Sequence, residues 1–451
     1  MSPLLLAILA YVALQLAVGF WISRRIQSED DYLVAGRSMG PLLATGTIFA
    51  TWFGAETCLG GAGAAYDGGV SLGTAEPFAY GLCVVFLGLV FARRLWHLRL
   101  TTLADFFERR YSRGVAQLAA VLMIPTSLLW AAAQIRAFGQ VLASAGEIEL
   151  ELAITLATAL VIVYTAAGGL LADAVTDLLQ SACLLLGLGV ILVGVVGAGG
   201  GWQASLAGAA ERVELLPADT GTLALLETWC VPVLGSVVAQ ELVVRVSAAR
   251  SAAVARGAAL GGGSLYVLVG AVPVFLGLIG PALVPELAHG EGILPELARR
   301  FLSPLGFALF AGALVSAILS TVDSTLLVCS SLLSHNLVLP RLRAPTERAK
   351  VRLARLGVVG FGLLAFALAL TSESVSGLVE QASALGSAGL FVLLVLGLFT
   401  RLGGAPSAGA ALVAGLVTYV AAEHGGSTTP FLLSLAGAAA AYLAATRWRP
   451  R

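Results

Sequence analysis

The sequence predicts an all-α integral membrane protein that crosses the bilayer thirteen times. Of its 451 residues, 58% are hydrophobic and only 12% are charged, about half the charge of a typical soluble domain. The apolar residues gather in runs of about 20, the length of a membrane-spanning helix, and the runs lack the period-two alternation of β-barrel strands. The formal net charge is zero, which gives no indication of nucleic-acid binding.

The apolar runs divide the chain into thirteen predicted spans. The first lacks a basic segment before its apolar run, and Arg24 and Arg25 follow that run, so we expect a mature helix and not a signal peptide. The predicted spans are residues 4–23, 42–66, 74–92, 115–145, 150–167, 172–198, 223–244, 252–282, 303–334, 352–371, 375–400, 405–423 and 428–446.

The basic residues predict the orientation of these spans. With the N-terminus outside and the C-terminus in the cytoplasm, 22 of the 26 Lys and Arg residues lie in or beside cytoplasmic segments. This bias follows the positive-inside rule for multi-pass proteins. We therefore expect a multi-pass protein of the cell's inner (cytoplasmic) membrane.

Polar residues inside a bilayer are costly and mark functional regions. The second to eleventh spans contain most of them, whereas the first, twelfth and thirteenth contain few. Ten central helices predict two repeats of five helices each. Because five is odd, the second repeat starts on the opposite side of the membrane from the first, so the two repeats have inverted topology. The whole chain, residues 1–451, then forms one transmembrane domain. Its predicted parts are residues 1–41 (first peripheral helix and loop), 42–198 (first repeat), 223–400 (second repeat) and 405–446 (two peripheral helices).

The first helix of each predicted repeat is interrupted by Gly or Pro. Residues 42–66 contain Gly54 and Glu56, and residues 223–244 contain Pro232. Transporters built from inverted repeats place their binding site at such interruptions, near the middle of the membrane. The alternative is that the small residues pack two helices together, although a packing face does not need Glu56.

A hydroxyl cluster lies in the middle of the ninth span. Ser320, Thr321, Asp323 and Ser324 follow one another closely there. Hydroxyls together with the carbonyls of an unwound helix form the kind of site that holds Na⁺ in membrane transporters. The alternative is that these hydroxyls bond carbonyls one turn back in their own helix.

Several motifs, in order, identify the family that the chain resembles. They are DYLVAGRSMG, FATWFGAE, RLTTLADFFERRYS, YTAAGGLLADAVTDLLQ, QELVVRVSAA and SAILSTVDSTLLVCSSLLSHNL, within roughly residues 31–400. The chain resembles the sodium/solute symporter family, which shares the inverted-repeat architecture of the leucine transporter. The resemblance implies a Na⁺ site and a cytoplasmic sodium route. The implied ligands are the carbonyls of Ala50, Phe53 and Ala317 and the hydroxyls of Ser320 and Thr321, with Asp177 and Asp323 on the route.

The same resemblance implies a solute site. The motifs are similar to those of the high-affinity choline transporter branch, whose members hold a quaternary ammonium in an aromatic cage. Where that branch has a Trp before the Gln of the seventh helix, this chain has Ala239. The carboxylates would favour a cationic solute, although they could also bond hydroxyls or amines or pair with Arg136. The implied residues are Trp52, Glu56, Thr57, Glu76, Trp130, Trp229, Glu380 and Gln381.

The expected function is sodium-coupled import of a small organic solute by alternating access, with a cationic amine such as choline as the first candidate. Proton coupling, or an amino acid, monocarboxylate or sugar as solute, is an alternative within the transporter class. A membrane sensor or a channel is the alternative outside it. The sequence contains no HExxH or CxxC motif, so we expect no enzyme, no cofactor and no metal other than Na⁺. The expected partners are the solute, Na⁺ and the lipid bilayer, and the oligomeric state is left open.

Overall fold

The computed structural model describes most of the chain. The described residues are 10, 13–14, 17–18, 20–22, 24, 26–54, 56–146, 148–216, 221–287, 290–372, 378–379, 382, 384 and 386–447. Most of the predicted first span, and both Glu380 and Gln381, lie outside them.

Within these residues the structure consists of helices and loops, with two isolated β-bridges and no strand. Seven helices are long and apolar enough to cross a membrane, and a bent pair raises the number to eight. This confirms an all-α membrane protein without confirming the count of thirteen. The seven are Phe78–His97 (α5 and α6), Arg113–Ala143 in α8, Gly169–Ala198 in α9, Ala252–Leu283 (α13), Pro304–Arg341 (α15 and the turns after it), Glu347–Thr371 (α16) and Ala405–His424 (α19).

The helix predicted at residues 42–66 is broken. Helix α3 (Pro41–Trp52) ends at Phe53, whose φ of −89° and ψ of 76° leave the helical region. A widened turn, Glu56–Gly61, then leads into α4 (Ala62–Gly68). Backbone carbonyls at such a break are released from helical hydrogen bonding and can bind a ligand.

The helix predicted at residues 223–244 is also broken, as α11 (Thr222–Cys230) and α12 (Gln240–Ala248). Between them Ala239 is extended, with φ −61° and ψ 124°, and the two parts of the span meet at 49°. The predicted end at residue 244 is wrong. Helix α12 continues to Ala248, and Arg245, which the prediction put in the following loop, is only 1% exposed.

The spans predicted at residues 150–167 and 172–198 are the two halves of α9 (Leu150–Ala198), which is kinked at Gly169. The φ of Gly169 is +63°, in the left-handed region that favours glycine. Tyr32, from α2 (Glu29–Val34), packs against it, because a Cβ atom at Gly169 would lie 2.7 Å from the Tyr32 ring. The second half of α9 carries Asp173 and Asp177.

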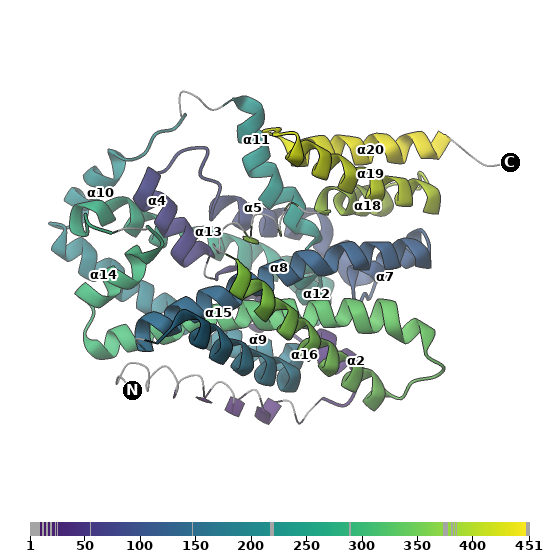
Figure 1. Ribbon diagram of the computed structural model, residues 1–451, viewed down its shortest axis with the longest axis horizontal. Helices are drawn as coiled ribbons and strands as arrows, with labels where there is room; N and C mark the ends of the chain where they lie inside the picture. Colours follow the sequence, from purple (N-terminus) through teal and green to yellow (C-terminus); the bar gives the residue numbers. More distant parts are fainter. Residues whose placement is uncertain are drawn as a thin grey trace.

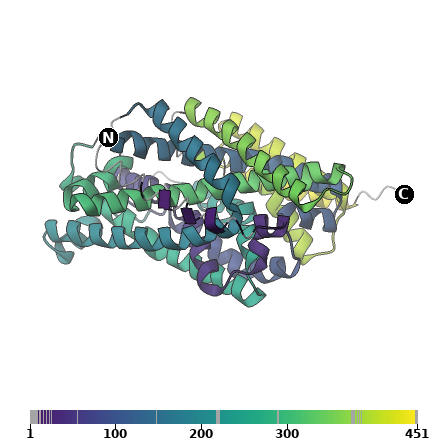
Figure 2. The same ribbon diagram turned by 90° about the horizontal axis from the view of Figure 1, so that it is seen from below.

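Helix α15 (Pro304–Ser331) lies at the centre of the molecule and packs against α8 (Arg113–Gly146) and α9 (Figure 1). Its most apolar window is 75% buried, against 28% for α19, so α15 belongs to the core and α19 to the periphery. Helix α13 packs against α3 and α5 on another side of the bundle, and Figure 2 shows the long helices stacked in layers.

Shorter helices complete the molecule. Those near the C-terminus pack together at one side in Figure 1. The remaining helices are α7 (Leu103–Arg110), α10 (Trp202–Ala210), α14 (Ile293–Phe301), α18 (Ser387–Phe399) and α20 (Pro430–Arg447).

Candidate functional site

The end of α3 meets the middle of α15 at Thr321. Its hydroxyl Oγ1 lies 3.1 Å from the carbonyl oxygen of Thr51 and 3.2 Å from that of Ala317. Phe53, whose carbonyl is a predicted ligand, stands at the break itself. Hydroxyl and carbonyl oxygens from two helices therefore converge where the sequence predicts Na⁺, and these are ligand types suited to that ion.

Asp177 links the same two helices one turn further along. It is fully buried and accepts hydrogen bonds from the hydroxyls of Ser320 and Thr47, the latter at 2.5 Å. Ser320 is thus joined to Asp177, its predicted neighbour on the sodium route. One carboxylate connects α3, α9 and α15 at this point.

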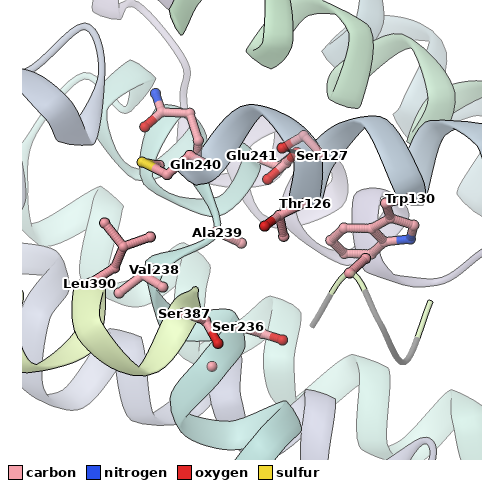
Figure 3. A pocket seen from close by; sticks show the side chains of 13 residues that line it. Thr126, Ser127, Trp130, Ser236, Val238, Ala239, Gln240, Glu241, Ser387 and Leu390 are labelled. Atoms are coloured by element: carbon pink, nitrogen blue, oxygen red, sulfur yellow. Dashed lines mark hydrogen bonds between the residues drawn. The ribbon is translucent and has the colours of Figure 1, made fainter. Parts of the chain in front are cut away.

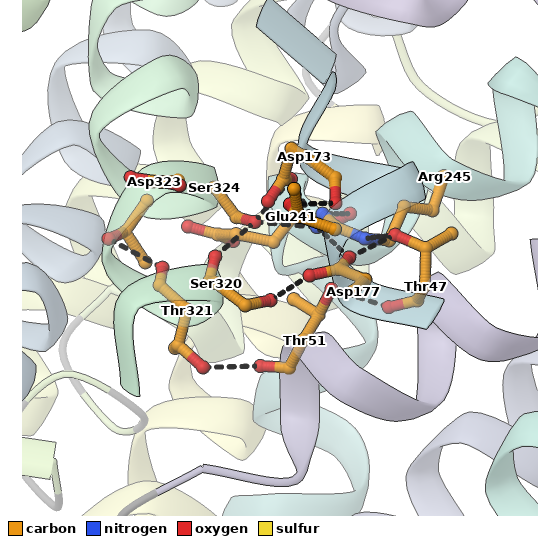
Figure 4. Close-up of polar contacts among 12 residues, drawn as sticks. Thr47, Thr51, Asp173, Asp177, Glu241, Arg245, Ser320, Thr321, Asp323 and Ser324 are labelled. Carbon is orange, nitrogen blue, oxygen red and sulfur yellow. Dashed lines mark hydrogen bonds and ion pairs between the residues drawn. The ribbon is translucent and has the colours of Figure 1, made fainter. Parts of the chain in front are cut away.

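A buried arginine occupies the centre of this polar region (Figure 4). Arg245 Nη2 lies 2.8 Å from Asp173 Oδ2 and 3.5 Å from Asp177 Oδ2. Its Nε donates to Thr47 Oγ1 at 3.0 Å, and its Nη2 donates to Ser324 Oγ at 2.5 Å. The planar guanidinium presents several donors in a fixed geometry, which suits it to bridge partners on different helices.

The carboxylates here outnumber the positive charges. Three buried carboxylates, each at most 2% exposed, belong to this cluster: Asp173, Asp177 and Asp323. Among the described residues, the ion pairs of the cluster are those of Arg245 with Asp173 and Asp177. Asp323 accepts a hydrogen bond from Thr165. The other oxygen of Asp323, Oδ2, and the Oδ1 atom of Asp173 have no hydrogen-bond partner in the described part of the chain. Buried polar atoms normally have partners, so this cluster can take up a proton or a cation.

Sequence reasoning missed Asp173 and Arg245. The available signal was spacing: Asp173 stands one helical turn before Asp177, and Arg245 one turn after Glu241. Residues four apart share one face of a helix. A carboxylate beside a predicted sodium-route residue was therefore detectable, but the predicted boundary put Arg245 in a loop.

Aromatic rings gather next to the break in α3. The ring centroid of Trp52 lies 4.9 Å from that of Trp130 and 5.5 Å from that of Tyr80. Trp52 and Trp130 are buried, and their indole nitrogens make no hydrogen bond with the described residues. The sequence predicted these two tryptophans together but missed Tyr80.

Trp229, the third predicted wall, does not join this group among the described ring contacts. Its Nε1 instead donates to the carbonyl of Leu72 at 2.7 Å. Arg136, the basic residue predicted inside a span, donates to the carbonyl of Ala369 at 2.9 Å.

Three predicted solute residues lie beside the break. Thr57 donates to Glu76 Oε1 at 3.0 Å, and Tyr266 donates to the same oxygen at 3.2 Å. The Oε2 atom of Glu56 accepts a hydrogen bond of 2.5 Å from Gln134. No described basic side chain forms an ion pair with Glu56 or Glu76.

Gly54 brings the predicted ion site and solute site next to each other. A Cβ atom at Gly54 would lie 3.1 Å from Thr321 Oγ1 and 3.2 Å from Glu56 Oε2. A predicted sodium ligand and a predicted solute residue therefore face the same short stretch of backbone.

Known proteins share this architecture. The structure is similar to that of a Na⁺-coupled sialic acid symporter in its substrate-bound outward-open state, with a TM-score of 0.86, 19% identity, and coverage of 100% of this chain and 99% of that chain. It is also similar to MHP1, a nucleobase-cation-symport-1 family transporter, in a closed conformation, with a TM-score of 0.65, 16% identity, and coverage of 92% of this chain and 94% of that chain.

Curated relatives are transporters as well. The human high affinity choline transporter 1 is 26% identical over 433 residues, which are 88% of this chain and 73% of that protein. The Escherichia coli sodium/pantothenate symporter is 27% identical over 353 residues, which are 74% of this chain and 72% of that protein. The model of the sodium:solute symporter family matches residues 32–415. The chain belongs to this family, and is a sodium-coupled membrane transporter and not an enzyme.

Proposed function

We propose that the protein imports a small organic cation, with a quaternary amine such as choline as the first candidate. The observation that carries the proposal is the grouping of Trp52, Trp130 and Tyr80 close to two glutamates, the buried Glu56 and the half-buried Glu76. Aromatic faces attract ammonium groups, and buried carboxylates without a basic partner favour a positive ligand. The choline transporters among its relatives support the same class of solute.

We propose that Na⁺ binds between α3 and α15, held by the carbonyls of Ala50, Phe53 and Ala317 and the hydroxyls of Ser320 and Thr321. The convergence of Thr321 with the Thr51 and Ala317 carbonyls supports this site. Sodium binding would join the two helices and favour the state that binds solute, which is the linkage that coupling requires. Each charge that crosses 100 mV contributes about 2.3 kcal/mol.

The proposed route for Na⁺ into the cytoplasm passes Asp177 and Asp323. Ser320, a proposed ligand, donates a hydrogen bond to Asp177, so an ion leaving the site would meet this carboxylate next. Alternating access would then open the cytoplasmic side.

We propose the full topology from the sequence: thirteen spans, inverted repeats at residues 42–198 and 223–400, and an outside N-terminus in the inner membrane. The two broken helices support the repeats, because each stands first in its half of the chain. Cysteine accessibility at Arg24 and Arg343, replaced singly by Cys, would test the orientation. Both positions should react only from the cytoplasmic side.

Proton coupling is a second candidate that one observation favours. The unpartnered oxygens of Asp173 and Asp323 could hold a proton in place of a second cation. Uptake measured against sodium concentration at fixed pH, and against pH at fixed sodium, separates the two coupling ions.

The test of solute and ion is uptake by purified protein in proteoliposomes, with an inward sodium gradient and a negative interior. The panel would contain choline, betaine, proline, glucose and a short monocarboxylate. We expect sodium-dependent choline uptake that Trp52→Ala abolishes. Sodium-driven uptake of an uncharged or anionic member alone would refute the cationic solute and keep the sodium coupling.

A further inference from the structure

Trp130 lines a pocket between α8 and the break that precedes α12 (Figure 3). It encloses about 420 Å³ free of protein atoms, part of which is open to solvent. Ser127 and Trp130 of α8 form one wall. Ser236 and Ala239 at the break before α12, with Glu241 in the first turn of α12, form another.

Glu241 is the charged group of this pocket. Its side chain is 1% exposed, and its Oε1 accepts a hydrogen bond of 2.7 Å from Ser127 Oγ. A carboxylate can accept about four hydrogen bonds. Among the described residues Glu241 forms no ion pair, since the guanidinium of Arg245 contacts its backbone carbonyl at 3.3 Å and turns to Asp173 and Asp177.

The backbone around Glu241 supports a negative charge. Glu241 stands in the first turn of α12, where the positive end of the helix dipole favours carboxylates. The carboxylate is therefore held at the wall of the pocket without an ion pair among the described residues, although Arg245 contacts the backbone carbonyl of Glu241. A positively charged or hydrogen-bond-donating ligand group would complete it, because buried carboxylates without such a group are strongly disfavoured.

Ala239 gives this ligand group its space. It is extended, and its small side chain lines the same pocket as Trp130 and Glu241 (Figure 3). Trp130 also contacts Trp52 ring to ring at 4.9 Å. Trp130 therefore belongs both to the wall of the pocket and to the aromatic group.

We propose that Glu241 and Ser127 bind a second polar group of the solute, an amine or a hydroxyl, while its first ammonium contacts Trp130. The size of the side chain at position 239 then limits the length of the part of the solute that carries this second polar group. This inference rests on the proposed import of an organic cation and specifies its chemistry: the solute carries a hydrogen-bond donor a short chain away from its ammonium.

Three probes of equal size test the assignment. They are propyltrimethylammonium, choline and (2-aminoethyl)trimethylammonium, which end in a methyl, a hydroxyl and an ammonium group. Binding to the full-length protein in lipid nanodiscs with saturating Na⁺ would be measured by calorimetry. We expect the ammonium-ended probe to bind at least about tenfold more tightly than the methyl-ended probe, as one charge-assisted hydrogen bond implies.

The Glu241→Gln variant should lose most of that preference while still binding the methyl-ended probe. The matched control is Glu227→Gln, because Glu227 is a buried glutamate of α11 that bonds the backbone nitrogens of Phe431 and Leu432 outside the pocket. This control should keep the wild-type ranking of the three probes. If Glu241→Gln fails to fold, Ala239→Leu provides the second test, because the larger side chain should weaken all three probes more than tetramethylammonium.

The outcomes separate the two proposals. Equal affinity of the wild-type protein for the three probes, or an unchanged ranking in Glu241→Gln, overturns the second-group site and leaves the cationic solute standing. No binding of any of the three probes, by a protein that still takes up another solute with Na⁺, overturns the cationic solute and this inference together.

Discussion

Removing Arg245 tests whether the buried charge cluster is one energetic unit. We consider Arg245→Met, which preserves much of the apolar side-chain volume but removes the ion pairs with Asp173 at 2.8 Å and Asp177 at 3.5 Å. Asp177 retains hydrogen bonds from Ser320 and Thr47, whereas Asp173 retains Ser324 alone. Removing one partner of a buried pair costs about 3–5 kcal/mol, because the other charge stays buried.

The size of the coupling follows from the same contacts. Asp173→Asn alone leaves Asp177 to neutralise Arg245, so we expect it to cost about 1.5–3 kcal/mol, the range of a hydrogen bond to a charged group. In the Arg245→Met background the same change removes an uncompensated charge and should cost much less. The expected coupling energy is therefore about 2 kcal/mol, within the range for residues in direct contact.

The assay is unfolding in mixed micelles with increasing SDS, followed by circular dichroism, for the wild type, both single variants and the double variant. Arg250→Met is the control, because Arg250 lies just after α12 and is exposed, and exposed substitutions stay within about 0.5 kcal/mol. Additivity of the two single changes within about 0.5 kcal/mol would refute the view that Arg245 stabilises Asp173.

Three further predictions concern the ion, the solute and acid. Thr321→Ala or Ser320→Ala should raise the sodium concentration for half-maximal uptake about tenfold with a smaller change in maximal rate; unchanged sodium dependence in both would remove the site. Glu56→Gln should weaken Na⁺ and the cationic solute together, measured by calorimetry, and an effect on one ligand alone would contradict a shared role. Burial alone would raise the pKa of Asp105, but the hydrogen bond and charge of His335 and the hydrogen bonds of the Thr102 N–H and the Asn336 amide lower it to about 2. Because folding lowers the pKa of Asp105 from an unfolded value near 4, the ionised carboxyl stabilises the fold by roughly 2 kcal/mol above that pH, and this stabilisation is lost as pH falls from about 4 to 2. Asp105→Asn should therefore flatten the pH dependence of the free energy of SDS unfolding in this range. A pH dependence identical to that of the wild type would argue against this role of Asp105.

Much of the helical architecture follows from residue pattern. Long apolar runs predict the spans, and Gly54 with Glu56 predicts the break after α3, because a helix-packing face in lipid does not need a carboxylate. The kink at Gly169 was predicted only as a boundary between two spans. Two helical segments do meet at this residue, but its packing against Tyr32 is a tertiary contact that local sequence does not encode.

The site was predicted in part, for a similar reason. Thr321 was found because a cluster of hydroxyls in an apolar helix is conspicuous, and Asp177 was found because its motif resembles that of the family. Tyr80 was missed because a tyrosine in a span is equally typical of an interfacial anchor. Arg245 was missed because basic residues are normally taken to end a span, and only its partners from α9 explain its burial.

The backbone at Gly54 has a consequence for engineering this transporter towards new solutes. Since Thr321 and Glu56 both face this glycine, a substitution that reshapes the segment changes the affinity for Na⁺ along with the selectivity for the solute. Binding reciprocity makes the two changes inseparable. Libraries that vary residues 52–56 would therefore select variants with altered sodium coupling. Ser127 and Ala239, on the wall of the pocket, are positions where solute selectivity can be changed while sodium coupling is kept.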